Sequence, residues 1–227
     1  MMYRYETHLH TSPVSRCAKF GVADTLAFYK QLDFTGVFIT NHYPDAPSYP
    51  DKTYEERIAH LFSDYENALV IGKEIGLDVF FGVEITTGGS DFLIYGLDKE
   101  WYLAHPEVET LKMRQRLEAL RENGALIVHA HPFREARYID HIRLFPRSIH
   151  GVEIDNACRT DFENKMAALY AENYGFLTLA GSDNHIASKL PRLAGVEFAT
   201  KLKDEADFIA RIFNNEQTLF TVDNPQE

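Results

Sequence analysis

Short apolar runs alternate with helical patterns along this chain, and this alternation constrains the fold more than any other feature. Runs that predict strands cover residues 3–7, 36–40, 77–84, 92–96, 125–129, 151–155, 176–180 and 218–222. Helical patterns cover residues 25–32, 54–75, 106–123, 160–174 and 205–213. Strands that alternate with helices indicate parallel βαβ units, so we expect an α/β fold.

Residues able to bind metals follow one predicted strand after another, from the start of the chain to near its end. A closed barrel gathers the carboxyl ends of its parallel strands into one mouth. An open sheet gathers them only near the point where the strand order reverses. The distribution therefore favours a small barrel with the candidate site at its mouth.

The composition is that of a globular protein with an acidic surface. The chain has 227 residues, 45% of them hydrophobic and 25% charged, and no Pro-, Gly- or Ser-rich linker divides it, so we expect one domain over residues 1–227. The formal net charge of −11 disfavours binding to nucleic acid or to an anionic membrane, because both need a basic face. An anionic substrate remains compatible with this charge, because bound cations can reverse the local field.

Targeting features make the cytoplasm the expected location. No run of about 18 apolar residues is present, so no membrane span is expected. Residues 1–7 lack the apolar core of a signal peptide. The two cysteines, Cys17 and Cys158, cannot form a disulfide framework, which favours a reducing compartment.

The first three strand ends carry histidines and a carboxylate. His8 and His10 are two residues apart, so both imidazoles should point the same way, and such a pair suits zinc, manganese or iron. His42 lies just past the second strand, and Glu84 ends the third. A carboxylate at that place is costly to bury unless it is paired or bound to a metal. Taken singly, each has a simpler interpretation: surface histidines, a loop histidine with local hydrogen bonds, and a salt-bridge partner.

Two later strand ends carry similar pairs. His129 and His131 follow the apolar run 125–128, and Asp183 and His185 follow the strand 176–180 with the same two-residue spacing. Most of the ten histidines thus lie at predicted strand ends. Packing alone does not account for such a series, which therefore predicts a metal site.

In this order and spacing, the motifs resemble those of the PHP family, named for polymerase and histidinol phosphatase. The motifs are His8-Leu9-His10, Thr40-Asn41-His42, Gly82-Val83-Glu84, His129-Ala130-His131-Pro132 and Gly181-Ser182-Asp183-Asn184-His185. Residues 151–156, followed by a helical pattern, are also similar to the last motifs of that family. The resemblance implies a distorted (β/α)7 barrel of the TIM-barrel kind, two or three divalent metal ions, and phosphoester hydrolysis.

The resemblance also implies a set of metal ligands. Its members are His8, His10, His42, Glu84, Asp91, His131, Asp183 and His185. Glu84 matches a carboxylate that bridges two metals, and His42 and His185 match ligands of a third. Catalysis would involve His42, Glu84, His131 and Asp183 directly.

Several positions depart from the family pattern. The first loop lacks the His or Asp that members often carry, so the third metal has no obvious further ligand unless Cys17 serves. The histidine that often follows the bridging glutamate is missing, and Asp91 is its only substitute. Asn41 stands where an Asp is common. His129 could be a metal ligand, a residue that orients a ligand, or a core residue.

The inferred site contains the parts that phosphoester hydrolysis needs. Two cations a few Å apart lower the pKa of a bridging water and supply hydroxide as the nucleophile. A protonated His42 or His129 could donate a proton to the leaving oxygen. Arginines bind two phosphate oxygens at once, although any one of them could be an ordinary surface residue. The candidates are Arg16, Arg134, Arg137 and Arg159.

These features predict a metal-dependent phosphatase of small phosphomonoesters, similar to histidinol-phosphate phosphatase, with zinc, manganese or iron as cofactor. The alternatives are a nuclease or other phosphodiesterase, which the acidic charge disfavours, and a metal-binding accessory module without catalysis. An amidohydrolase is disfavoured because no lysine lies at the relevant strand ends to be carbamylated. The expected partner is a small phosphorylated substrate, not a membrane or nucleic acid.

Overall fold

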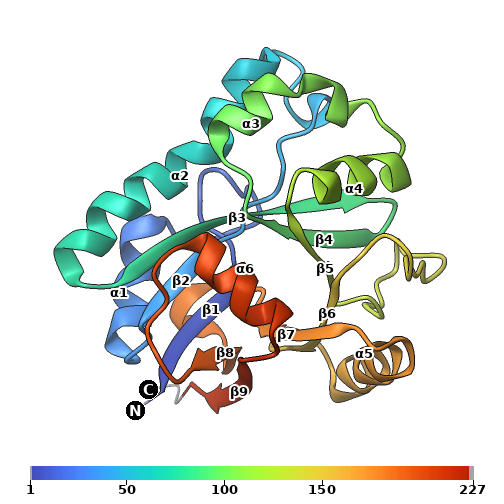
Figure 1. The fold of residues 1–227 in the computed structure, drawn as a ribbon. Helices are drawn as coiled ribbons and strands as arrows, with labels where there is room; N and C mark the ends of the chain where they lie inside the picture. The colour runs from blue at the N-terminus through green and yellow to red at the C-terminus, as the bar shows by residue number, and fades with distance from the viewer. Residues whose placement is uncertain (1, 225–227) are drawn as a thin grey trace.

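The computed structural model describes residues 2–224, which form a nine-stranded sheet and six α-helices (Figure 1). The strands are β1 (Tyr3–Leu9), β2 (Gly36–Ile39), β3 (Asp78–Thr87), β4 (Ser90–Tyr95), β5 (Leu126–Ala130), β6 (Gly151–Asn156), β7 (Leu177–Gly181), β8 (Arg192–Phe198) and β9 (Thr218–Asp223). The α-helices are α1 (Val22–Gln31), α2 (Tyr54–Ile75), α3 (Lys99–Ala104), α4 (Met113–Glu122), α5 (Asp161–Tyr174) and α6 (Glu205–Phe213). Short 3-10 turns cover Ala46–Ser48, Pro106–Glu109 and Ala187–Lys189.

The sheet curls into a nearly closed barrel, which confirms the predicted fold class. Its strand order is β7-β6-β5-β4-β3-β2-β1-β8-β9. A parallel bridge then joins the end of β1 to the segment after β7: His10 N donates to Asn184 O at 3.1 Å, and Asn184 N donates to His8 O at 3.3 Å. The carboxyl ends of β1 and β7, far apart in the sequence, are thereby brought together.

The expectation of parallel strands is confirmed for β1–β2–β3 and for β5–β6–β7, and it is wrong for β4 and β8. β4 runs antiparallel to both β3 and β5, and β8 runs antiparallel to β1 and β9. Gly88 and Gly89, at φ 54° and 84°, make the tight turn that joins β3 to β4 as a hairpin. β3 therefore continues beyond Glu84 to Thr87 instead of ending at Glu84. The helix expected over 106–123 is a 3-10 turn followed by α4, and β8 and α3 lie in segments where no element was expected.

An apolar core fills the barrel near the amino ends of its parallel strands. The helix α6 lies across this end of the sheet (Figure 1) and packs Phe208 and Ile212 into the core. The Phe208 ring lies 4.4 Å from that of Phe38 on β2. The opposite end of the barrel is left for polar side chains. Across residues 2–224, none of the helices is both long and apolar enough to cross a membrane.

Candidate metal centre

A buried cluster of imidazoles and carboxylates lies at the carboxyl ends of the parallel strands. Its members are His8, His10, His42, Glu84, His131, Asp183 and His185. Within residues 2–224, three overlapping groups have ligand atoms that all lie within 4.8 Å of one another. The groups are His8–Glu84–His131, His8–His10–Asp183 and His10–His42–His185. The barrel thus gathers the residues predicted from separate strand ends, as its geometry requires.

Glu84 lies at the centre of the cluster and faces four imidazoles. Its Oε1 is 3.3 Å from His8 Nε2 and 3.4 Å from His131 Nε2. Its Oε2 is 2.8 Å from His42 Nδ1 and 3.4 Å from His10 Nε2. Each carboxylate oxygen of Glu84 thus faces a different pair of imidazoles.

Asp183 faces the cluster from the other side. Its Oδ1 lies 3.5 Å from Nε2 of both His8 and His10, and its Oδ2 lies 3.6 Å from His131 Nε2. Asp183 and His131 have φ values of 52° and 27°, a backbone region that non-glycine residues rarely adopt. Such backbone conformations cluster at functional sites. At His131 this conformation interrupts the strand alternation, so its side chain and that of His129 enter different surroundings.

Two buried nitrogens in the cluster lack a hydrogen-bond partner within residues 2–224, namely Nε2 of His8 and Nε2 of His10. The other nitrogen of each ring is held in place: His8 Nδ1 lies 2.9 Å from Glu153 Oε1, and His10 Nδ1 lies 3.0 Å from Ser15 Oγ. A metal-binding histidine has this arrangement, with one nitrogen fixed by a hydrogen bond and the other free for the cation. These residues therefore fit divalent metal ions.

The electrostatics of the cluster favour bound cations. Burial alone would raise the pKa of Glu84, but the charges of His42 and His8 and a hydrogen bond with His131 outweigh it and hold the pKa well below its usual range. Burial, together with His185 and His42, lowers the pKa of His10 well below its usual value. Glu84 is therefore ionised and His10 neutral, which are the forms that bind metals. For His8 and His42, by contrast, the neighbouring carboxylates outweigh burial and raise the pKa above its usual value, so these two imidazoles would release a proton on binding a metal.

Buried carboxylates behind the cluster were not predicted as site residues. Glu153 on β6 accepts hydrogen bonds from His8 Nδ1 and, at 3.1 Å, from His131 N. Glu6 on β1 accepts from His8 N at 2.9 Å and from Ser182 N at 2.8 Å. Burial raises the pKa of Glu6 to about 7, although hydrogen bonds from Ser182 and His8 oppose this shift. In the sequence, Glu6 and Glu153 are charged residues inside predicted buried strands. That pattern could have marked them as site residues, but it is equally typical of a salt bridge.

Asp91 lies beside the cluster rather than within it, in contrast to the expected ligand role. Its Oδ2 is 3.8 Å from His131 Nδ1, on the opposite side of the ring from Glu84, and 2.9 Å from Arg134 Nη2. Within residues 2–224, Asp91 is in none of the three candidate metal groups. His129 is also outside them: it stacks on Phe92 with ring centroids 4.9 Å apart. Of the three roles considered for His129, the structure shows the core residue.

The four candidate arginines occupy different surroundings. Arg159 Nη2 lies 3.9 Å from Asp183 Oδ2, and Arg134 reaches the cluster edge through Asp91. Arg16 stacks over Tyr49, with 4.1 Å from its guanidinium carbon to the ring centre. Arg137 is exposed, forms no ion pair within residues 2–224, and lines a cavity together with Arg134.

Cys17 contacts the most exposed part of the cluster. Its thiol lies beside His185 and His42 and interacts with both rings. Partial burial would raise the pKa of this thiol, but the two histidines outweigh that effect and lower it to about 6. A thiolate beside His42 and His185 could supply the further ligand that the third group otherwise lacks.

The comparisons with known sequences cover parts of the chain. A family model described as PHP-associated matches residues 161–216. An uncharacterized protein from Methanocaldococcus jannaschii is 35% identical over 112 residues, which are 46% of this chain and 45% of that protein. The chain therefore spans less than half the length of this curated relative.

Two solved structures share the whole fold. One is a two-domain protein from Bacteroides vulgatus that contains a predicted PHP-like metal-dependent phosphoesterase, with a TM-score of 0.72 at 14% identity. That match covers 97% of this chain and 65% of the other, slightly less than two thirds. The other is PsfC from Pseudomonas syringae, with a TM-score of 0.64 at 20% identity over 97% of this chain and 91% of PsfC.

The chain thus shares the barrel fold of these two structures, and the cluster at the mouth of the barrel is a candidate metal site. The PHP-associated model, over residues 161–216, confirms the resemblance to the PHP family that the sequence motifs predict, and the first of these structures shares the fold.

Proposed function

We propose that this chain is a metal-dependent phosphatase that acts on small phosphomonoesters. The observation that carries the proposal is the pair of buried, unpartnered Nε2 atoms of His8 and His10, which face the carboxylates of Glu84 and Asp183 within residues 2–224. The PHP-like metal-dependent phosphoesterase within the Bacteroides vulgatus structure supports the same class of reaction.

The three groups of ligand atoms indicate which residues would hold the ions. His8, Glu84 and His131 form one group, and Asp183 joins His8 and His10 in the second. Mixed imidazole and carboxylate donors suit zinc, manganese or iron. When bound, such ions would offset the charge of a phosphoryl group and lower the pKa of a water molecule.

The remaining chemistry falls to side chains at the edge of the cluster. Arg159, next to Asp183, and Arg134, next to Asp91, are placed to orient phosphoryl oxygens through bidentate hydrogen bonds. His42 is 36% exposed and lines an adjoining cavity. When it holds no metal, its protonated form can donate a proton to the leaving oxygen of the ester.

A phosphate-release screen tests this proposal. Protein purified without chelator is assayed with a panel of phosphomonoesters and diesters, before and after treatment with EDTA. We expect release from monoesters, its loss with EDTA, and its recovery with zinc, manganese or iron. Faster cleavage of diesters would favour a nuclease or phosphodiesterase instead. If the metal-loaded protein cleaves no ester, a metal-binding module without catalysis becomes the better account.

A further inference from the structure

A cavity of about 770 Å³ adjoins the cluster and extends from it to α4. His42 and Cys17 line the part that borders the cluster, and Arg116 on α4 lines another part. The rest of the lining is mixed: it includes the apolar Ile85 and Met113 and the polar Asp45 and Thr86. The cavity is therefore continuous with the site at which the phosphoester would react.

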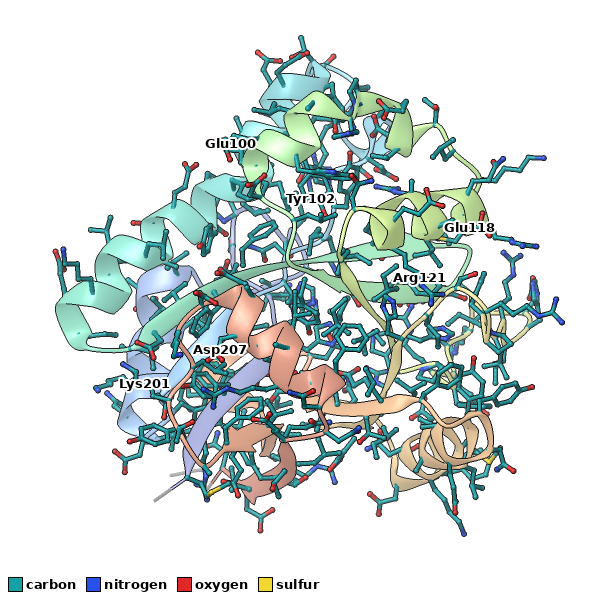
Figure 2. The ribbon with its side chains drawn as sticks, viewed as in Figure 1. Glu100, Tyr102, Glu118, Arg121, Lys201 and Asp207 are labelled. Atoms are coloured by element: carbon teal, nitrogen blue, oxygen red, sulfur yellow. The ribbon has the colours of Figure 1, made fainter. Side chains whose placement is uncertain are left out.

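Arg116 is a buried cation without a counter-ion. Its side chain is on the buried side of α4 and only 7% exposed, whereas Arg121 on the same helix, labelled in Figure 2, is exposed. Its Nε and Nη2 have no hydrogen-bond partner within residues 2–224, and it forms no ion pair there. Its guanidinium carbon lies 4.3 Å from the ring centre of Tyr43. A cation–π contact offsets only part of the cost of burying a charge.

A neighbouring arginine shows that the same region can supply a carboxylate. Arg57 on α2 is 4% exposed and is ion-paired with Glu109, whose Oε2 accepts from Arg57 Nη2 at 2.6 Å. Glu109 also lines the cavity, yet its carboxylate pairs with Arg57 and not with Arg116. The positive charge of Arg116 is thus left for an anion that enters the cavity.

The backbone fixes Arg116 relative to the cluster. Tyr43, on which Arg116 stacks, directly follows His42, and its N–H donates to Glu84 O at 2.8 Å. The ring beneath the guanidinium is therefore attached to the strand that carries the central carboxylate. An anion on Arg116 would be held at a set distance from a phosphoryl group at the cluster.

We propose that Arg116 binds a second anionic group of the substrate, so that the preferred phosphoester carries a carboxylate or a second phosphate on its leaving group. This inference rests on the proposed phosphatase function and adds a substrate class to it. The cavity that joins the two positions has apolar and polar lining residues, so its volume and not its polarity limits the part of the substrate that separates the two anions.

Matched substrates test the inference. Alkyl phosphates are compared with ω-carboxyalkyl phosphates and with alkane bisphosphates of the same chain lengths, so that carboxylate and phosphate are distinguished. We expect kcat/KM for one anionic series to exceed that for the neutral series by about 10- to 100-fold at the best length, since hydrogen bonds to a charged group contribute about 1.5–3 kcal/mol. Arg116→Met should remove this preference and leave the neutral esters nearly unchanged.

Two further variants separate binding from folding. Arg114→Met on the same helix is the matched control, because Arg114 is exposed and its ion pair, with Glu118, lies on the surface. The Arg114→Met protein should keep the full preference for anionic over neutral esters. Arg116→Lys retains the charge and should keep part of the preference, because lysine lacks the planar fork of arginine. Equal losses on neutral and anionic esters in Arg116→Met would indicate a structural role and overturn the proposal, as would a wild type without preference.

Binding of phosphonate analogues separates this inference from the proposed function. Isothermal titration calorimetry compares alkylphosphonates with ω-carboxyalkyl and ω-phosphonoalkyl phosphonates, which cannot be hydrolysed. If no ester is cleaved but an anionic analogue binds more tightly to the wild type than to Arg116→Met, the proposed function fails and the anion site stands. If esters are cleaved while neither assay shows an anionic preference, only the role of Arg116 is overturned.

Discussion

Hydrogen bonds to the Nδ1 atoms of His8 and His10 decide which nitrogen of each ring faces the cluster. Glu153 occupies Nδ1 of His8 and Ser15 occupies Nδ1 of His10, which leaves both Nε2 atoms without partners within residues 2–224. The contacts of Glu84 with these two rings depend on the ring orientations. Residues behind the cluster should therefore affect metal affinity although they need not touch the ions.

Among the residues behind the cluster, Glu153 should have the largest effect on metal affinity. Glu153→Ala should weaken metal affinity by about 10- to 100-fold, because the substitution leaves His8 Nδ1 and His131 N without their acceptor. Competition titration against a chelator of known affinity measures the effect. Glu118→Gln, on the outer face of α4, should bind metal like the wild type. Unchanged affinity in a folded Glu153→Ala protein would show that Glu153 does not position the ligands.

Cys17 and the cluster ligands should respond differently to substitution. Cys17→Ser should retain substantial phosphatase activity, because Cys17 can only support the exposed group formed by His42 and His185. His10→Ala and Asp183→Ala should each lose orders of magnitude in kcat/KM, because each removes a donor from the buried groups. Steady-state assays with metal-saturated protein measure kcat/KM for each of these variants. An inactive Cys17→Ser beside active ligand variants would indicate cysteine catalysis.

At the scale of elements, the contact between β1 and β7 depends on a glycine. A Cβ atom at Gly181 would lie 2.6 Å from His8 Cβ and 2.8 Å from Glu153 Oε1, both closer than van der Waals contact allows. Gly181 therefore permits the close approach that closes the barrel behind the candidate ligands.

Gly181→Ala should destabilise the protein by about 1–3 kcal/mol and weaken metal binding, because the added methyl group pushes β7 away from His8. Urea denaturation with and without metal measures both effects. Gly21→Ala provides a comparison, because the nearest atom to its Cβ would be 3.7 Å away. A Gly181→Ala protein as stable as the wild type would show that the β1–β7 contact can relax without cost.

Elements with strong local signals were predicted well. The bounds of α2 and α6 agree with the expected ranges, and α2 has a capping box at Thr53 and Glu56 and a left-handed glycine at Gly76. The predicted direction of β4 was wrong, because the direction in which a strand pairs depends on the whole sheet and not on the local sequence pattern. β8 contains Arg192, Gly195 and Glu197, which obscure its apolar alternation.

The candidate site was predictable to the extent that it lies at strand ends. The structure brings His8, Glu84 and His131 together because a barrel places strand ends in one mouth. Glu153 has no such signal, since it lies within a strand and acts through hydrogen bonds from other strands. The sequence also gives no signal for Arg116, because its burial against Tyr43 depends on how α4 packs.

For the molecule as a whole, the barrel separates an apolar end, closed by α6, from a polar end that holds the cluster. Buried carboxylates and imidazoles destabilise a fold unless they are paired or bind cations. The arrangement is therefore best explained as a barrel built to hold metal ions, and the number of ions bound is its central quantity.

Elemental analysis of metal-saturated, desalted protein tests this account most directly. We predict at least two divalent metal ions per chain, because Glu84 faces two pairs of imidazoles. In addition, the group that contains Glu84 and His131 shares His8 with the group that contains Asp183. Glu84→Gln should lose at least one ion and most of the activity while circular dichroism shows a retained fold. One ion or none per wild-type chain at saturation, or a full complement in Glu84→Gln, would contradict the account.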